Sequence, residues 1–186
     1  MKSVFVNLLS FKVGWTASVA GAAASVPALG AAAASGVVLF HLSRTKDRRA
    51  ESVLLISAAL IGLAWESALV AAGLIHYESG FLIPGLAPYW IVAMWVLFAT
   101  TLNVSMRWLR KNPLLTAAAG AIGGPLAFFA GERMGAVSFD DPMVSFAVIG
   151  LGWAILLPML VKLAARFDGH SVQAAHAQTR PGAYSS

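Results

Sequence analysis

Cysteine is absent from this 186-residue chain, which excludes disulfide bonds and thiol catalysis. Charge is also scarce, because only 11% of the residues are charged whereas 59% are apolar. A chain of this composition cannot bury its apolar surface in one soluble core. We therefore expect lipid to be the main solvent of the protein.

Polar breaks are missing from residues 4–43 as well. Apolar runs of roughly 17–25 residues can cross the hydrocarbon layer of about 30 Å as helices. One helix over residues 4–43 would be ~60 Å long, twice that thickness. Pro27 therefore predicts a tight turn between two spans. A cleaved signal peptide is the alternative for the first run, but Lys12 in its middle argues against it.

The sequence thus predicts an all-α, polytopic integral membrane protein with six transmembrane helices in one compact bundle. This bundle covers residues 1–167, and residues 168–186 are expected to form a disordered cytoplasmic tail. The expected spans are residues 4–24, 26–43, 52–75, 88–106, 114–131 and 143–165.

Basic residues are few on one side of the expected bundle. Eleven of the thirteen fall on the other side, namely Lys2, Arg44, Lys46, Arg48, Arg49, Arg107, Arg110, Lys111, Lys162, Arg166 and Arg180. The positive-inside rule places that side, and both termini, in the cytoplasm. The net charge of +5 is explained by this one-sided distribution of basic residues, so it does not predict a nucleic-acid partner.

Two ionisable residues lie within the expected spans, Lys12 and Glu66. A charge in hydrocarbon costs at least a few kcal/mol, so each is a candidate functional residue. Counted along the helices, Lys12 lies ~12 Å and Glu66 ~21 Å from the cytoplasmic side, which argues against a direct pair. We expect an outer polar cluster and a smaller inner one. The outer cluster comprises Glu66, His76, Glu132 and Arg133, and the inner one comprises Lys12, Asn103 and Ser105.

Glu66 is the main candidate for proton transfer, with Arg133 or His76 as the group that tunes it. The candidate substrate-binding residues are Trp65, Tyr77, Trp95, Lys12 and Asn103. Structural roles are the alternative: Lys12 could reach the inner headgroups, Arg133 could neutralise Glu66, and Asn103 could join two helices.

The histidines of the expected tail, His170 and His176, have no evident third ligand near them in the sequence. We expect them to be solvated, and we predict neither a metal site nor a cofactor.

Five glycines and one proline gather in residues 119–136. This stretch lacks the GKS/T ending of a phosphate-binding loop. Gly120, Gly124 and Gly131 fall on one helical face, where another backbone can approach closely. Pro125 predicts a kink near the membrane centre.

One further set of residues is spread over 4–167, namely Asn7, Phe11, Trp15, Pro88, Trp90, Trp95, Phe98 to Asn103, Ser105, Trp108, Leu109, Gly120, Gly123, Gly124, Pro125, Gly131 and Gly135 to Val137. Together these residues resemble the bacterial inner-membrane family called domain of unknown function 2878. The family is uncharacterised, so the resemblance implies an inner-membrane location and no defined activity. A fainter resemblance, through Glu66, Gly73 and Tyr77, is to membrane-embedded carotenoid cyclases and hydratases.

Three functions fit these residues. The first is cofactor-free modification of a membrane lipid, fatty acid or isoprenoid by Glu66. The second is transport of a small solute or proton past Glu66 and Lys12. The third is a non-catalytic role, in which small-residue faces dock a partner membrane protein or a second copy.

Overall fold

The computed structural model describes residues 2–170 and confirms the all-helical class. The helices are α1 (Lys2–Ala23), α2 (Pro27–Ser43), α3 (Arg48–Ala71), α4 (Tyr89–Leu102), a 3-10 helix η1 (Arg107–Lys111), α5 (Pro113–Arg133) and α6 (Pro142–Arg166). Two short strands, β1 (His76–Tyr77) and β2 (Val137–Ser138), pair antiparallel.

The turn predicted at Pro27 separates α1 from α2. Pro27 occupies the first turn of α2, where its missing N–H costs nothing, and Ser25 adopts the left-handed region with φ 60°. The two helices then pack closely, because a Cβ built at Gly30 would lie 2.4 Å from the Cα of Ser18. Residues 2–43 therefore form a tight helical hairpin.

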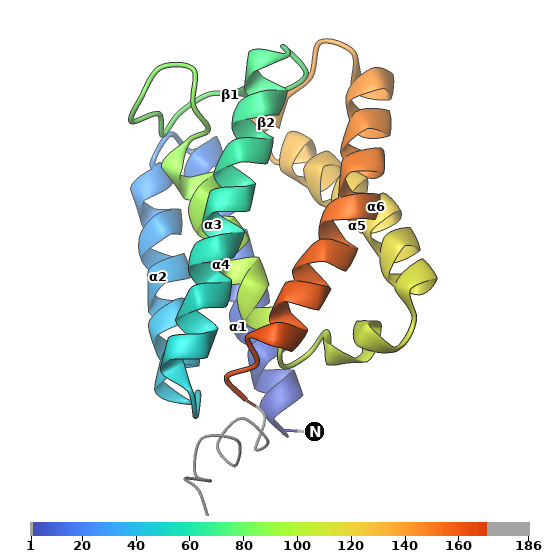
Figure 1. The fold of residues 1–186 in the computed structure, drawn as a ribbon. Coiled ribbons are helices and arrows are strands. Elements are labelled where there is room, and N and C mark those ends of the chain that lie inside the picture. The colour runs from blue at the N-terminus through green and yellow to red at the C-terminus, as the bar shows by residue number, and fades with distance from the viewer. Residues whose placement is uncertain (1, 171–186) are drawn as a thin grey trace, which may run out of the picture.

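The bundle has two chemically different ends (Figure 1). One end, which we call the sheet end, carries β1, β2 and the loops that surround them. The other, the basic end, carries the start of α1, the α2–α3 loop, η1 and residues 167–170 after α6. In the sheet, His76 pairs with Ser138 and Tyr77 with Val137, so the two loops expected on one side of the membrane lie together.

Four helices, α1, α3, α5 and α6, are long and apolar enough to cross a membrane. Large apolar side chains also cover their outer surfaces, as at Leu151 and Ile155 of α6, which are 70% and 71% exposed. Such a surface is typical of contact with lipid or with another apolar partner.

The other two helices, α2 and α4, are apolar but shorter, with 17 and 14 residues. The span expected over 88–106 is too long, since α4 ends at Leu102. Thr100 and Thr101 direct their hydroxyls back to backbone carbonyls, and the chain turns at Asn103. Six complete spans therefore remain a prediction.

The glycine stretch lies along the contact between α5 and α6. A Cβ built at Gly120 would be 2.1 Å from the carbonyl oxygen of Trp153, and one at Gly124 would be 2.5 Å from the Trp153 ring. Gly131 faces Val137 of β2, at 3.4 Å from a built Cβ. Helix α5 continues through Pro125, so the expected kink stays a prediction.

Residues 168–170, expected at the start of a tail, belong to the folded bundle. Asp168 and Gly169 are buried, and the Gly169 carbonyl accepts hydrogen bonds from the backbone N–H groups of Lys46 and Asp47 at 3.1 and 3.0 Å. The remaining tail, with His176 and Arg180, lies outside the described residues.

Two glycine substitutions in α5 test the α5–α6 contact, one at the contact and one away from it. Gly120→Ala forces a methyl group against the α6 backbone, and we expect it to cost about 1–3 kcal/mol. Gly123→Ala meets nothing within 4 Å, and we expect it to be neutral or to stabilise the helix by up to about 1 kcal/mol. Thermal unfolding in detergent measures both, and equal stability of the two variants would contradict this packing.

Candidate functional site

The Glu66 carboxyl is fully buried in the wall of the bundle, on the second-last turn of α3. Both of its oxygens accept hydrogen bonds: the Tyr77 hydroxyl donates to Oε2 at 2.7 Å, and the Trp95 indole N–H donates to Oε1 at 2.9 Å. Burial would otherwise leave a carboxyl without partners at a cost of several kcal/mol. The two donors explain how this acid is held inside the protein.

Each donor reaches Glu66 through a specific feature of the sequence. Tyr77 belongs to β1, and pairing with Val137 of β2 holds it over the end of α3. Trp95 lies against α3 at Gly62, where a Cβ would be 2.2 Å from its ring. Gly62 thus makes room for the indole one turn before the acid that it binds.

The phenol of Tyr77 is itself buried. Its burial and the neighbouring Glu66 carboxyl raise the pKa of Tyr77 well above its usual range. The group therefore stays neutral and keeps its proton as a hydrogen-bond donor over the physiological pH range.

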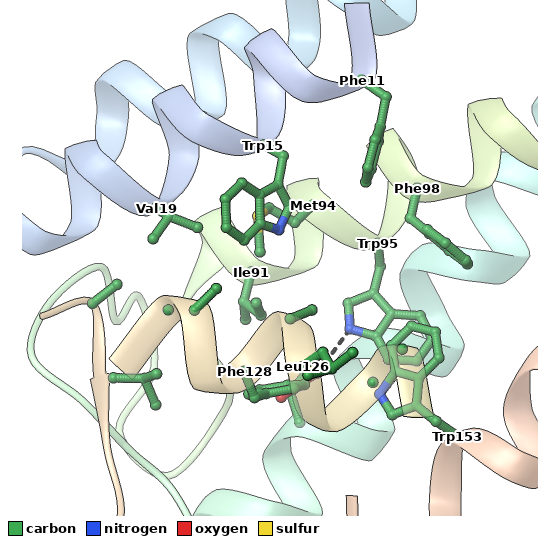
Figure 2. Close-up of a pocket in the computed structure, with 18 of the residues that line it drawn as sticks. Phe11, Trp15, Val19, Ile91, Met94, Trp95, Phe98, Leu126, Phe128 and Trp153 are labelled. Atoms are coloured by element: carbon green, nitrogen blue, oxygen red, sulfur yellow. Dashed lines mark hydrogen bonds between the residues drawn. The ribbon is translucent and has the colours of Figure 1, made fainter. Parts of the chain in front are cut away.

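An apolar cavity of about 410 Å³ lies beside Glu66 (Figure 2). Helices α1, α4, α5 and α6 contribute most of its wall, and Glu66 and Tyr77 are also among its lining residues. The labelled wall residues in Figure 2 are Phe11, Trp15, Val19, Ile91, Met94, Trp95, Phe98, Leu126, Phe128 and Trp153. Lys12 and Glu66 are the charged side chains of this lining.

Aromatic rings dominate the part of the wall next to Glu66. The indoles of Trp95 and Trp153 stack with ring centroids 4.9 Å apart, and Phe98 meets Trp153 edge-on at 5.4 Å (Figure 2). The Trp153 indole nitrogen is buried and has no hydrogen-bond partner within the part of the chain that the structure describes. The cavity therefore offers aromatic ring faces, and the N–H donor of one of its lining residues, Trp153, is unused.

The expected partners of Glu66, Arg133 and His76, lie elsewhere. Arg133 is exposed at the end of α5, and His76 is paired with Asp140 at 3.1 Å on the surface. Neither forms a hydrogen bond with Glu66 within residues 2–170, because the strand pairing turns Tyr77, the neighbour of His76, toward the acid. The outer cluster was expected to join Glu66 to His76 and Arg133. This expectation is wrong, because the partners of Glu66 are Tyr77 and Trp95.

Two other candidates lie at different places relative to the cavity. Trp65 packs against α6, where a Cβ at Gly152 would lie 2.0 Å from its ring, and it is not part of the cavity lining. Lys12 is exposed at the edge of the cavity, and its ammonium lies 5.7 Å from the centre of the Trp15 ring.

A second polar cluster lies at the basic end, around Glu51. Glu51 is fully buried in the first turn of α3. Its Oε1 lies 2.8 Å from His41 Nε2, and its Oε2 accepts hydrogen bonds from Asn103 Nδ2 at 2.8 Å and from the backbone N–H of Gly169 at 3.1 Å. Asn103 is thus a hydrogen-bond donor to Glu51. The inner cluster predicted from the sequence, in which Asn103 lies beside Lys12, is therefore wrong.

Charged pairs hold the end of α6 onto this cluster. Asp168 accepts hydrogen bonds from Arg107 at 2.6 Å and from Arg110 at 2.9 Å. Arg110 also donates to the Asn103 side chain. Ser105, expected beside Lys12, instead donates to Asn7 at 2.7 Å.

His170 is only half-buried, and it contacts His41 in addition to solvent. The two ring centroids are 4.9 Å apart, and the Nε2 atoms are 3.5 Å apart. Partial burial lowers the pKa of His170 from its usual value. A polar cavity of about 460 Å³ borders both rings, and Asn7, Asn103 and Arg107 are also among its lining residues.

The sequence gives little sign of the Glu51 cluster. Acidic residues are common and usually solvated in the first turn of a helix, where they interact favourably with the helix dipole. The position of Glu51 therefore does not indicate a functional site. Its partners are 10, 52 and 118 residues away. The one local signal is that Glu51 follows four basic residues at the start of an apolar run.

The family assignment rests on a direct comparison. A family model described as a protein of unknown function, DUF2878, matches residues 4–159, so the chain belongs to that family. Searches of curated proteins and of solved structures gave no match.

Proposed function

We propose that the protein binds a lipid or isoprenoid chain in the bacterial inner membrane and modifies it by acid–base chemistry at Glu66. The observation that carries this proposal is a buried carboxyl in the wall of a mainly apolar cavity, with both oxygens held by neutral donors. Cavities of several hundred Å³ with few polar groups are typical of small-molecule sites.

The opening of the cavity favours a ligand that arrives from the membrane. Lys12 of α1 and Leu126 of α5 both line the cavity and are both exposed, so the cavity opens between these two helices. Both helices have the length and hydropathy of a membrane span. A chain dissolved in the bilayer can therefore enter sideways without crossing water.

Polar groups at two points would orient such a chain. Lys12 at the opening would pair with an anionic headgroup or carboxylate, and its charge would stay near the polar edge. The unused N–H of Trp153 would donate to an oxygen on the ligand close to Glu66.

The proposed step needs no oxidant, reductant or cofactor. Neutral Glu66 gives its proton to one carbon of a C=C bond, and the other carbon becomes a cation. The faces of Trp95 and Trp153 stabilise that cation, since indole is the strongest natural cation–π partner. Loss of a proton from a neighbouring carbon back to the Glu66 carboxylate moves the double bond and restores the acid.

Tyr77 has a positioning role in this scheme. Its hydroxyl donates to the Glu66 carboxylate after proton loss, and its oxygen can accept from the neutral carboxyl before it. Both protonation states of Glu66 are therefore accommodated in the same geometry.

The proposal includes six membrane spans with both termini in the cytoplasm. The basic end would face the cytoplasm and the sheet end the opposite side. The shorter α2 and α4 would cross with help from local thinning of the bilayer or from neighbouring helices. Transport has less support, because the apolar cavity carries two charged side chains only.

Replacement of Glu66 tests the chemistry. Glu66→Gln preserves the shape and an acceptor for Trp95 but cannot supply the proton, so we expect a loss of at least about 100-fold in modification. The membrane lipids of a strain carrying this variant should then match those of a deletion strain, as measured by lipid mass spectrometry.

The matched control is Glu78→Gln, which changes an exposed acid in the loop after β1. It should restore the wild-type lipid profile. A Glu66→Gln protein that is present at wild-type level, unfolds at the wild-type temperature and still restores that profile would rule out the catalytic role.

Reporter fusions test the proposed orientation. A reporter that is active only outside the cytoplasm should give a signal in the loop at residues 134–136 and none in the loop at residues 44–47, because the second loop is basic. An outside signal at residues 44–47 would invert the proposed topology.

A further inference from the structure

Three potential metal ligands meet at the basic end of the bundle, remote from Glu66. His41 lies in the last turn of α2, Glu51 in the first turn of α3, and His170 follows α6. A ligand atom from each lies within 4.8 Å of the other two. Three separate elements thus place two imidazoles and one carboxylate around a common point.

The two imidazoles lie together without a good hydrogen bond between them, although His170 Nε2 also lies 3.2 Å from Thr45 Oγ1. If His41 Nε2 donates to Glu51 Oε1 at 2.8 Å, it has no lone pair left for His170. Yet His170 Nε2 lies 3.5 Å from His41 Nε2, which is long for a hydrogen bond. Two nitrogen ligands of one tetrahedral Zn²⁺, each bound at about 2.0–2.1 Å, lie about 3.3–3.4 Å apart, close to this separation.

The carboxylate is already oriented for a ligand role. Asn103 and the backbone N–H of Gly169 hold Glu51 Oε2, which leaves Oε1 directed at the histidines. Such outer hydrogen bonds fix a ligand and tune its affinity for metal. The turn that brings His170 close also requires glycine, because a Cβ at Gly169 would lie 2.4 Å from the Asp47 carbonyl oxygen.

We propose that His41, Glu51 and His170 bind one divalent transition metal, with Zn²⁺ as the reference ion. Two imidazoles and one carboxylate suit zinc-class ions better than Mg²⁺ or Ca²⁺, which prefer oxygen ligands. Three protein ligands leave a coordination position open, and the polar cavity bordered by His41 and His170 gives water or a polar ligand access to it.

This site is independent of the proposed chemistry at Glu66. Glu66 follows Glu51 by fifteen positions in α3, so the two acids lie about 22 Å apart along the helix. Binding of metal can therefore be measured whether or not the protein modifies lipids.

The test uses the full chain in detergent, purified through a tag without histidine and stripped with a chelator. Zn²⁺ is titrated in, and the bound ion is counted by elemental mass spectrometry. We expect one Zn²⁺ per chain, and Co²⁺ in its place should give the absorption of a four-coordinate site. His170→Ala and Glu51→Gln should each weaken Zn²⁺ binding by about 100-fold or more.

His76→Ala is the matched control, since it removes an exposed histidine at the sheet end and should leave Zn²⁺ binding unchanged. Thermal unfolding shows that each variant is folded, and His170→Ala is the mildest because it lies beyond the last helix. A wild-type protein that binds no Zn²⁺ would leave only a hydrogen-bonded cluster and would overturn the proposal. Undiminished binding by either Glu51→Gln or His170→Ala would also overturn it.

Discussion

Burial of the Glu66 carboxyl is the constraint on which the sheet end of the structure depends. The acid is fully buried beside an apolar cavity, where its two oxygens need donors from the protein. The β1–β2 pairing supplies the Tyr77 hydroxyl, and the missing side chain at Gly62 admits the Trp95 indole. The pairing of two short strands in a helical bundle therefore has a structural role: it positions the Tyr77 hydroxyl to donate to Glu66.

The basic end repeats this arrangement with different chemistry. Glu51 is buried at the opposite end of the same helix and binds Asn103, Gly169 and His41. Here the chain after α6, held by Arg107 and Arg110 through Asp168, closes the cluster as the sheet closes the other one. Helix α3 thus carries one buried acid near each end, and each is enclosed by a segment distant in sequence.

The sequence was sufficient for features that depend on local pattern. Apolar runs predicted the helices, Pro27 predicted the turn, and the cost of an acid in an apolar span singled out Glu66. The partners of Glu66 were not predictable in the same way. His76 and Tyr77 are adjacent, and only the strand register decides which of them turns inward. His170 likewise reads as solvated until the fold brings it to His41.

The central claim is that the cavity beside Glu66 holds an apolar chain, and native mass spectrometry of the protein purified from its own membranes tests it most directly. Gly123 and Gly36 both have open space around a built Cβ, but only Gly123 lines the cavity. The wild-type protein and Gly36→Leu should carry a bound lipid or isoprenoid, and Gly123→Leu should lose most of it. An empty wild-type protein, or equal occupancy in Gly123→Leu, would contradict the claim.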